Sequence, residues 1–272
     1  MVRVIQHKRE AYWFYSVLSR LYDRWVNPLF WTGAMRDAAL AEARLDDPAL
    51  DTLDAGAGTG FTTEGIVARV DAGRVTMLDQ SPHQLARAER KPALAGCRRL
   101  LGDAEALPFA DASFDRYVSA GSIEYWPDPL RGVAEAYRVL RPGGVGLVIG
   151  PVRPPGRAAR ALADAWMLFP SLEQYRRWFE RAGFADVTVR EVAPDWYRDG
   201  RGPYAAAVAG VRAPDGPPPL RLGPPAEQLG APLGPAARMR AVARFAVGSL
   251  AGAVFVPVAA ALTLRRRLDR RA

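Results

Sequence analysis

The chain has 272 residues, a formal net charge of +8 and a single cysteine, Cys97. This length is enough to bury one sizeable core, with some chain left over for an appendage. One cysteine excludes an intramolecular disulfide, and with only two histidines a metal site rich in Cys or His is implausible, so we expect no metal. Nearly all the positive charge is arginine, gathered at the C-terminus instead of beside aromatic side chains, so we do not expect a nucleic acid partner.

The N-terminal region is rich in aromatic residues. Its first ten residues are polar and charged, which is not the pattern of a cleavable secretory signal. Residues 11–26 repeat apolar side chains at helical spacing, and further rings, Tyr22 among them, lie on the other faces. The pattern predicts a helix packed on the core that also forms a lid over an apolar ligand or a membrane interface. We expect Asn27-Pro28 to end this helix, a second helix at 33–43, and a lid region spanning residues 1–44.

Glycines at positions 56, 58 and 60 follow a short apolar run that ends at Asp54. Glycine adopts backbone conformations that other residues avoid, and its missing Cβ lets a ligand lie against the main chain. A dinucleotide-binding loop has the pattern G-x-G-x-x-G, but position 61 is Phe and the third glycine comes one residue early. The pattern D-x-G-x-G-x-G is typical of S-adenosylmethionine (SAM) binding and favours methyl transfer over hydride transfer. The alternative is an ordinary glycine-rich turn.

Acidic residues follow the next two predicted strands. Residues 74–79 form an apolar run that ends in Asp79, which lies 19 positions after Gly60. A carboxylate about 20 residues beyond such a loop is placed to bind ribose hydroxyls. Residues 100–105 end a third strand, where Asp103 can accept a hydrogen bond from an adenine amino group. Acids at three successive strand ends favour the SAM site over an unliganded turn.

Strands and helices then alternate, which predicts a doubly wound, mostly parallel sheet. Ser81-Pro82 is a helix start signal, and Gly183 is a helix stop signal. We expect a Rossmann-like α/β methyltransferase domain at residues 45–212, closed by an antiparallel strand pair. Its predicted elements are helices at 62–70, 130–140, 157–168 and 172–182, and strands at 114–119, 145–149, 187–192 and 204–211.

The C-terminal part differs in composition. Residues 213–244 are predicted to be a proline-rich, semi-rigid linker, with eight prolines between 213 and 235. Residues 245–264 carry no charge and are bounded by arginines. A helix of this length spans about 30 Å, the thickness of the hydrocarbon core of a bilayer. A buried core helix is the alternative, but no domain is left for it to join. We therefore expect a single-pass transmembrane anchor, and its orientation stays open.

Long runs of residues are shared with one known family. They are VIQHK (4–8), AYWFY (11–15), GTGFTT (58–63), LDQSPHQLA (78–86), RYVSAGSIEYWPDP (116–129), GPV (150–152), WMLFP (166–170) and WYR (196–198). In these runs the chain resembles the methyl-phytyl-benzoquinol and methyl-solanyl-benzoquinol methyltransferases of plastids and their cyanobacterial relatives. The resemblance extends from about residue 4 to the terminal anchor and is far more specific than the glycine loop.

The resemblance implies a class I SAM-dependent methyltransferase fold with a C-terminal transmembrane helix in the plastid inner envelope. It implies C-methylation of a prenylated benzoquinol, 2-methyl-6-phytyl- or 2-methyl-6-solanyl-benzoquinol, in tocopherol and plastoquinone biosynthesis. No transit peptide precedes residue 1, so we expect a mature form or a source that needs none. The candidate SAM-binding residues are Asp54, Ala55, Gly56, Gly58 and Gly60 in the loop, Asp79 and Gln80 on the ribose side, Asp103 and Ala104 on the adenine side, and Ser119 and Tyr22 nearby.

A ring carbon of a hydroquinone becomes nucleophilic when a phenolic proton leaves, so a positioned general base helps the reaction. The fourth strand ends beside the methyl group, and Glu124 is the first choice of base because no other carboxylate precedes Asp128 there. An exposed loop acid is the alternative. His83 is second, since histidine exchanges a proton near neutral pH. Tyr125, Trp126 and Trp166 offer apolar surface to a prenylated ring, or pack in the core.

Two other hypotheses remain open for the chain. One is a methyltransferase that acts on a different membrane lipid, such as a sterol or a phospholipid headgroup. The other is a non-catalytic protein of SAM-binding fold that serves as a membrane assembly factor. Methyl transfer from labelled SAM to a prenylated benzoquinol distinguishes the first hypothesis from both.

Overall fold

The computed structural model describes residues 27–197, 202–214 and 218–224. It also describes backbone positions 234–236, 238–239, 242–243, 246, 250, 257, 260–261 and 263–264. The side chains at 27, 28, 158, 165 and 166 are excluded from the description. The aromatic helix predicted at 11–26, with the candidate cofactor residue Tyr22, lies outside the described residues.

A seven-stranded sheet forms the centre of the described chain, in the order β3-β2-β1-β4-β5-β7-β6. Strands β1 to β5 pair in parallel, and β7 is antiparallel to both of its neighbours, as the sequence predicts for a doubly wound sheet. The last strand, β7, lies between β5 and β6, so the predicted antiparallel pair of β6 and β7 closes this end of the sheet. The strand bounds are β1 Thr52–Ala55, β2 Val75–Asp79, β3 Arg98–Leu101, β4 Phe114–Ala120, β5 Leu140–Pro151, β6 Phe184–Val192 and β7 Ala205–Arg212.

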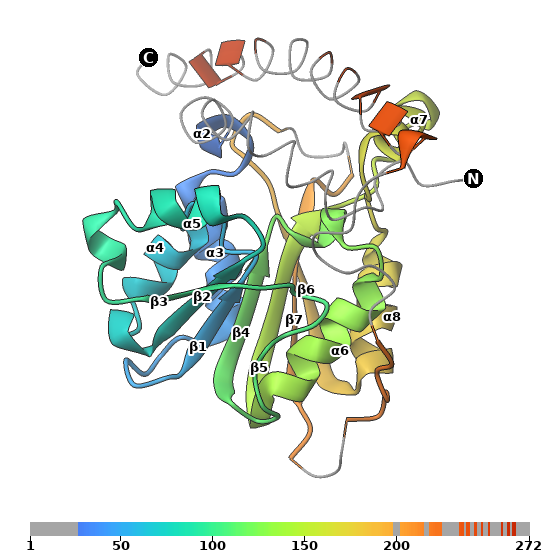
Figure 1. Cartoon of the computed structure of the whole chain (residues 1–272). Coiled ribbons are helices and arrows are strands. Elements are labelled where there is room, and N and C mark those ends of the chain that lie inside the picture. The colour runs from blue at the N-terminus through green and yellow to red at the C-terminus, as the bar shows by residue number, and fades with distance from the viewer. Residues whose placement is uncertain are drawn as a thin grey trace.

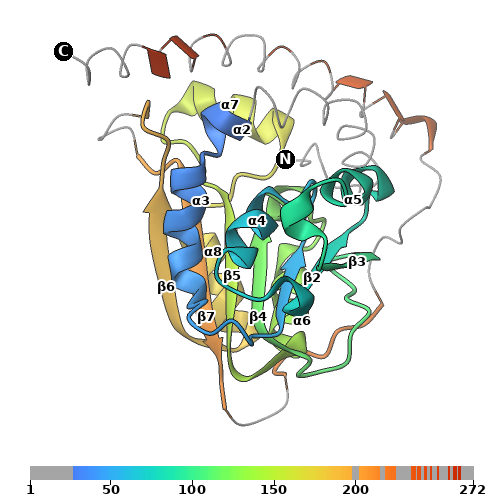
Figure 2. The same ribbon diagram turned by 90° about the vertical axis from the view of Figure 1, so that its left-hand side faces the viewer.

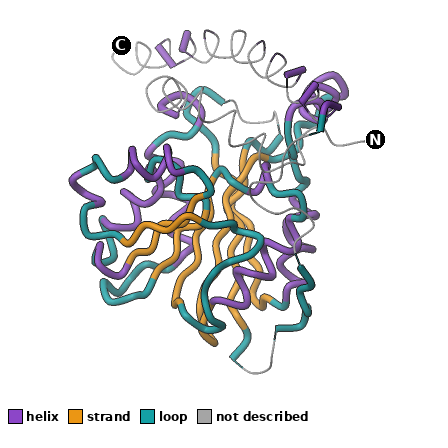
Figure 3. Tube along the Cα trace, in the orientation of Figure 1, coloured by secondary structure: helices purple, strands orange, loops and turns teal. Residues whose placement is uncertain are grey.

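Helices cover both faces of this sheet, as Figures 1 and 2 show. One face carries α3, α4 and α5, whose buried side chains share a core cluster with Met77 and Val118. The other face carries α6 and α8, which pack on a second cluster that contains Tyr117. The tube in Figure 3 shows the same layers, with the strands between the helices. The helix bounds are α2 Asn27–Phe30, α3 Gly33–Leu40, α4 Phe61–Val67, α5 Pro82–Ala88, α6 Pro129–Val139, α7 Arg157–Trp166 and α8 Leu172–Ala182.

Local signals in the sequence fix several helix ends. Ser81 caps α5 by accepting a hydrogen bond from the backbone N–H of Gln84, and Pro82 occupies the first helical position. Ser171 and Gln174 form a reciprocal capping box at the start of α8. Gly183 ends α8 in the left-handed conformation, with φ of 100°. These predicted boundaries are confirmed.

Several predicted boundaries were wrong in detail, among them the following. Asn27 and Pro28, expected to end the aromatic helix, lie within the short helix α2, while the end of the aromatic helix itself lies outside the described residues. Strand β5 begins at Leu140, directly after α6, because Leu140 pairs with Phe114 of β4; the Gly143 turn therefore falls inside the strand. Strand β3 ends at Leu101, before the Asp103–Ala106 turn.

The proline-rich segment is not a free spacer where the structure describes it. Leu220 and Leu222 pack against the core cluster beneath α6 and α8. A Cβ added at Gly183 would lie 2.6 Å from Cγ of Pro219, so the segment comes very close to the end of α8. We call residues 218–224 the strap. The proline-rich, semi-rigid linker at 213–244 stays a prediction, to which the structure adds that the strap contacts the core.

The described positions between residues 235 and 264 are helical. Their large apolar side chains face solvent: Met239, Val242, Leu250 and Leu264 are each at least 60% exposed. Within the described part of the chain, no helix combines the length and apolar character that a membrane crossing requires. Most of the predicted anchor, 245–264, falls outside that part. The transmembrane prediction is thus not confirmed.

Candidate active site

The glycine loop joins β1 to α4 at the carboxyl edge of the sheet. The backbone N–H groups of Gly56 and Ala57 both donate to the carbonyl of Leu78 at the end of β2, at 2.7 and 3.0 Å. Gly58 has φ of 56°, and a Cβ added there would meet nothing within 4 Å. A Cβ added at Gly56, in contrast, would lie 2.3 Å from Oγ of Ser122. The loop is therefore packed from behind at Gly56, while the bare backbone at Gly58 faces open space.

Asp79 connects this loop to the second strand. One carboxylate oxygen accepts from the backbone N–H of Gly58 and the other accepts from the N–H of Ser81, both at 2.8 Å. Burial raises the pKa of Asp79, and these two hydrogen bonds partly offset that effect. Each oxygen keeps a further lone pair, so the carboxylate can also accept from a ribose hydroxyl. Gln80 follows and is half-buried.

Asp54 lies inside β1, beneath the loop. Its Oδ2 accepts from the hydroxyl of Thr63 on α4 at 2.6 Å, whereas its Oδ1 is buried and has no hydrogen-bond partner. Burial raises the pKa of Asp54 to about 7, and the nearby charge of Asp79 adds to this shift. A buried carboxylate oxygen without a partner is costly in free energy, unless a ligand such as the amino group of SAM supplies a donor.

Asp103 stands at the neighbouring strand end, as predicted. Gly102 donates its N–H to the carbonyl of Asp79 at 3.0 Å, which ties the end of β3 to that of β2. Oδ1 of Asp103 accepts from the N–H of Glu105 at 2.9 Å and so holds a tight turn. Ala104 in this turn is buried. The acids expected on the ribose and adenine sides of the cofactor therefore lie on adjacent strand ends.

Glu124 follows β4, in a short 3-10 turn at Ile123–Tyr125. Its Oε2 is buried with no hydrogen-bond partner, and burial raises the pKa of Glu124 to about 7. The alternative of an exposed loop acid is therefore wrong. The carbonyl of Glu124 accepts from the N–H of Leu168 at 3.4 Å, so the segment after α7 reaches this turn. Oγ of Ser119, at the end of the same strand, is also buried without a partner.

The other candidates are placed differently. His83 is exposed on α5, which follows β2, and β1 separates that strand from β4. Trp126 packs in the core cluster: a Cβ added at Gly132 of α6 would lie 2.4 Å from its ring. Tyr125 is 8% exposed beside it. The side chain of Trp166 is outside the described structure.

Sequence reasoning missed Ser122. Its hydroxyl accepts from the indole N–H of Trp126 at 3.0 Å and lies directly behind Gly56. It therefore connects the glycine loop to the turn that carries Glu124. The sequence shows Ser122 only as a hydroxyl residue just after the fourth strand. Its contact with the glycine loop depends on how β1 packs beside β4, which no local pattern reveals.

Of the six buried side-chain atoms without a hydrogen-bond partner among the described residues, three lie at the strand ends next to the glycine loop. Asp54 Oδ1, Ser119 Oγ and Glu124 Oε2 are buried on β1, on β4 and just after β4, the two central strands next to the glycine loop. Together with the open backbone at Gly58 and the acids after β2 and β3, they supply acceptors for an amino group, ribose hydroxyls and adenine. The residues present thus fit SAM.

Comparisons with known proteins place the chain among methyltransferases. A family model described as a methyltransferase domain matches residues 53–148. The chain is 52% identical over 259 residues to the chloroplastic 2-methyl-6-phytyl-1,4-hydroquinone methyltransferase 2 of Oryza sativa subsp. japonica, covering 94% of this chain and 74% of that protein. It is 51% identical over 257 residues to the corresponding chloroplastic protein of Arabidopsis thaliana, covering 93% and 75%.

Among solved structures, a SAM-dependent methyltransferase from Thermotoga maritima, titled a possible histamine N-methyltransferase, matches with a TM-score of 0.55 and 23% identity. The match covers 74% of this chain and 99% of that chain. A likeness at this level of identity concerns the fold.

The buried carboxyl group of Glu124 makes stability depend on pH. Its folded-state pKa of about 7 lies above the ordinary value of 4.5. The stabilising contribution of the protonated group is therefore complete below pH 4.5 and is lost as the pH rises to about 7. The side chain of Glu124→Gln stays neutral at every pH. Between pH 4.5 and pH 8, the unfolding free energy of the wild type should therefore fall by on the order of 3 kcal/mol relative to that of this variant. Chemical denaturation of both proteins across this range measures the difference. A difference that stays constant with pH contradicts the prediction.

Proposed function

The chain belongs to the 2-methyl-6-phytyl-1,4-hydroquinone methyltransferase family and is a SAM-dependent methyltransferase, and we propose that it methylates a ring carbon of a prenylated benzoquinol. The substrate is 2-methyl-6-phytyl- or 2-methyl-6-solanyl-benzoquinol, in tocopherol and plastoquinone biosynthesis. The observation that carries this proposal is about 50% identity to the named relatives over more than nine-tenths of the chain.

When bound, SAM supplies a methyl group on a positively charged sulfur. The glycine loop presents bare backbone at Gly58, and the carboxylate of Asp54 beneath it offers an unpartnered oxygen to the amino group of the cofactor. Asp79 accepts from the ribose hydroxyls and Asp103 from the adenine amino group. Ala55, Gly56, Gly60, Gln80, Ala104 and Ser119 line the remaining contacts. Holding two reactants in this geometry provides much of the catalysis in a displacement reaction.

Glu124 is the proposed general base. Its buried carboxyl group follows β4, and its pKa of about 7 is suited to accepting a proton near neutral pH. Removal of the phenolic proton makes the ring carbon more nucleophilic. Its Oε2 is buried without a partner in the protein, and we propose that a substrate hydroxyl supplies the missing donor. His83 is the second candidate, but its exposed position on α5 is less suited to the role.

We propose that Tyr125, Trp126 and Trp166 form the apolar surface for the substrate. Trp126 supports this surface from the core side, because its ring packs on Gly132 and its indole N–H donates to the hydroxyl of Ser122. The segment after α7 approaches the base through the hydrogen bond from Leu168 to Glu124.

We also propose that the protein works in the plastid, attached to the inner envelope membrane by its C-terminal segment. Two observations support this. The relatives named above are chloroplastic proteins. In addition, Met239, Val242, Leu250 and Leu264 expose their apolar side chains along that segment. A substrate with a long prenyl tail resides in lipid, so membrane attachment brings the enzyme to it.

Purified full-length protein should transfer the labelled methyl group of SAM to both prenylated benzoquinols. Product analysis by mass spectrometry after incubation with each quinol checks this and gives the preferred tail. Transfer to a sterol or a phospholipid instead of either quinol overturns the substrate assignment. SAM binding without turnover on any lipid acceptor points to a non-catalytic role.

Glu124→Gln should lower kcat by roughly a factor of 10² to 10⁴ while SAM affinity stays unchanged, because the amide cannot accept the phenolic proton. In the wild type, kcat should rise with pH up to about 7 and then level, because the deprotonated carboxylate is the active form. Steady-state kinetics and calorimetric titration with SAM measure these quantities. Unchanged turnover removes Glu124 from the role, and His83→Gln tests the alternative base.

Deleting residues 245–272 should release the protein from lipid vesicles and leave SAM binding intact, because the proposed SAM-binding residues that the structure describes lie within residues 54–119. Co-sedimentation with vesicles of chloroplast lipid composition, with and without the deletion, measures the difference. If the shortened protein still sediments with vesicles, another segment attaches it, and the aromatic region 11–26 is then the one to delete.

A further inference from the structure

The strap returns the chain to the cofactor edge of the sheet. Strand β7 is antiparallel to β5, so it ends at Arg212 on the edge opposite the glycine loop. The strap, residues 218–224, then lies beside α6 and α8, where Leu220 and Leu222 pack on the core cluster (Figure 1). Its position is therefore fixed by contacts with the same helices that support the active site.

Arg131 joins the strap to the loop that carries Asp103. Its Nε donates to the carbonyl of Glu105 at 2.6 Å, and its Nη1 donates to the carbonyl of Gly223 at 2.5 Å. A guanidinium group is planar and its donors have a fixed spacing, so two carbonyls bound to one group are held in a fixed relation. Arg131 lies in the first turn of α6, whose position is set by the Asp128 cap.

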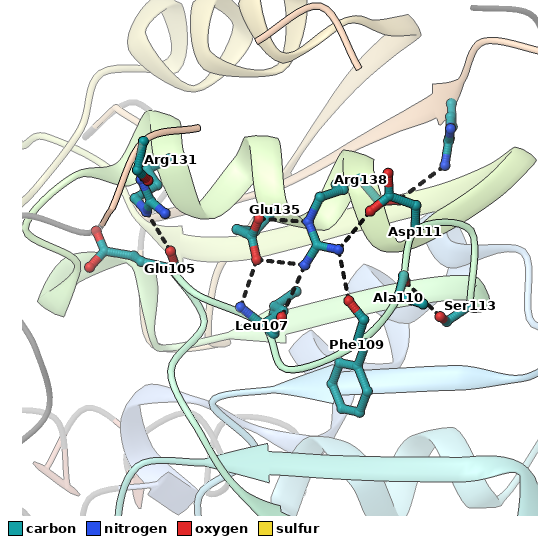
Figure 4. A network of polar contacts seen from close by, with 11 residues as sticks. Glu105, Leu107, Phe109, Ala110, Asp111, Ser113, Arg131, Glu135 and Arg138 are labelled. Carbon is teal, nitrogen blue, oxygen red and sulfur yellow. Dashed lines mark hydrogen bonds and ion pairs between the residues drawn. The ribbon is translucent and has the colours of Figure 1, made fainter. Parts of the chain in front are cut away.

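The loop itself is fastened to α6 along its length (Figure 4). Nearest the cofactor, Glu105 donates its N–H to Asp103 and accepts from the N–H of Asp128 through Oε1 at 2.5 Å. Further along, Oε2 of Glu135 accepts from the N–H of Leu107 at 2.6 Å. Arg138 continues the series, since it pairs with Glu135 and donates to the carbonyls of Leu107 and Phe109.

These bonds differ in what they connect. Glu135 and Arg138 join the loop to α6 alone, whereas Arg131 also reaches the strap, 92 residues further along the chain. The other carbonyl that Arg131 binds, that of Glu105, lies within the Asp103–Ala106 turn. Displacement of the strap therefore removes one of the two acceptors of Arg131 and loosens its hold on this turn.

We propose that Arg131 is a positioning residue for the adenine-binding turn, and that it couples cofactor binding to the seating of the strap. This inference rests on the proposed contact of Asp103 with adenine. Coupling of this kind is reciprocal: a seated strap strengthens cofactor binding, and bound cofactor protects the strap to the same extent. Because the proposed membrane-binding segment follows the strap, cofactor affinity would respond to how that segment is held.

The test uses full-length protein with Arg131→Gln. Calorimetric titration with S-adenosylhomocysteine and with its inosine analogue, which lacks the adenine amino group, measures affinity and base discrimination. We expect the variant to bind S-adenosylhomocysteine about 5- to 20-fold more weakly and to lose part of the preference for adenine. The KM for SAM should rise while kcat at saturating SAM is unchanged. Arg131→Lys, which keeps the charge but not the paired donors, should recover affinity only in part.

Three further measurements separate positioning from a merely structural role. Arg177→Gln on α8, where the arginine pairs with Glu173 across exposed surface, is the matched control and should change nothing. Leu222→Ser disturbs the strap without touching the loop and should weaken S-adenosylhomocysteine binding in the same direction. In wild type, S-adenosylhomocysteine should slow hydrogen exchange of the amides at 220–223, and in Arg131→Gln it should not.

Lower thermal stability of Arg131→Gln with unchanged affinity and unchanged base discrimination overturns the proposal. So does Asp103→Ala that discriminates adenine from hypoxanthine as wild type does, because alanine has no side-chain acceptor and Arg131 would then have no adenine contact to position. Neither result bears on methyl transfer to the quinol, which the labelled-SAM assay decides separately.

Discussion

The carboxylate of Asp79 joins the glycine loop to the end of β2, and the rest of the site is arranged around that connection. Its two oxygens hold the N–H of Gly58 in the loop and that of Ser81 at the start of α5. These bonds fix the loop in a conformation that requires positive φ and leaves bare backbone toward open space. If Asp79 also binds the ribose hydroxyls, as proposed, one buried carboxylate both orders the loop and recognises the cofactor.

The site contains buried polar atoms that the protein does not satisfy. Asp54, Ser119 and Glu124 each keep an unpartnered oxygen at the centre of the sheet, and burial raises the pKa of both carboxyl groups to about 7. Such atoms reduce the stability of the free protein. They are tolerated where a ligand supplies the missing donors, and a raised pKa is suited to a group that must gain and lose a proton. Stability and chemistry therefore oppose each other at these positions.

Helix α6 links the two halves of the active site. On the side of the proposed base, Gly132 leaves room for the ring of Trp126. The indole N–H of Trp126 in turn donates to Ser122 behind the glycine loop. Toward the adenine side, Glu135 and Arg138 fasten the loop after β3, and Arg131 adds the strap. A shift of this one helix moves the segment that carries the proposed base and the turn that carries Asp103 together.

The sequence by itself determined the order of strands and helices along the chain, the three-glycine loop, the acids at the strand ends and several helix caps. These depend on residues close in sequence: hydrophobic period, capping side chains and glycines that allow positive φ. Only the tertiary structure decided that β7 inserts beside β5, that residues 218–224 pack on the core, and that Glu124 is buried without a partner. Each of these results from contacts between distant segments, such as that of Arg131 with Gly223, and the free energy of such packing is not encoded in any local pattern.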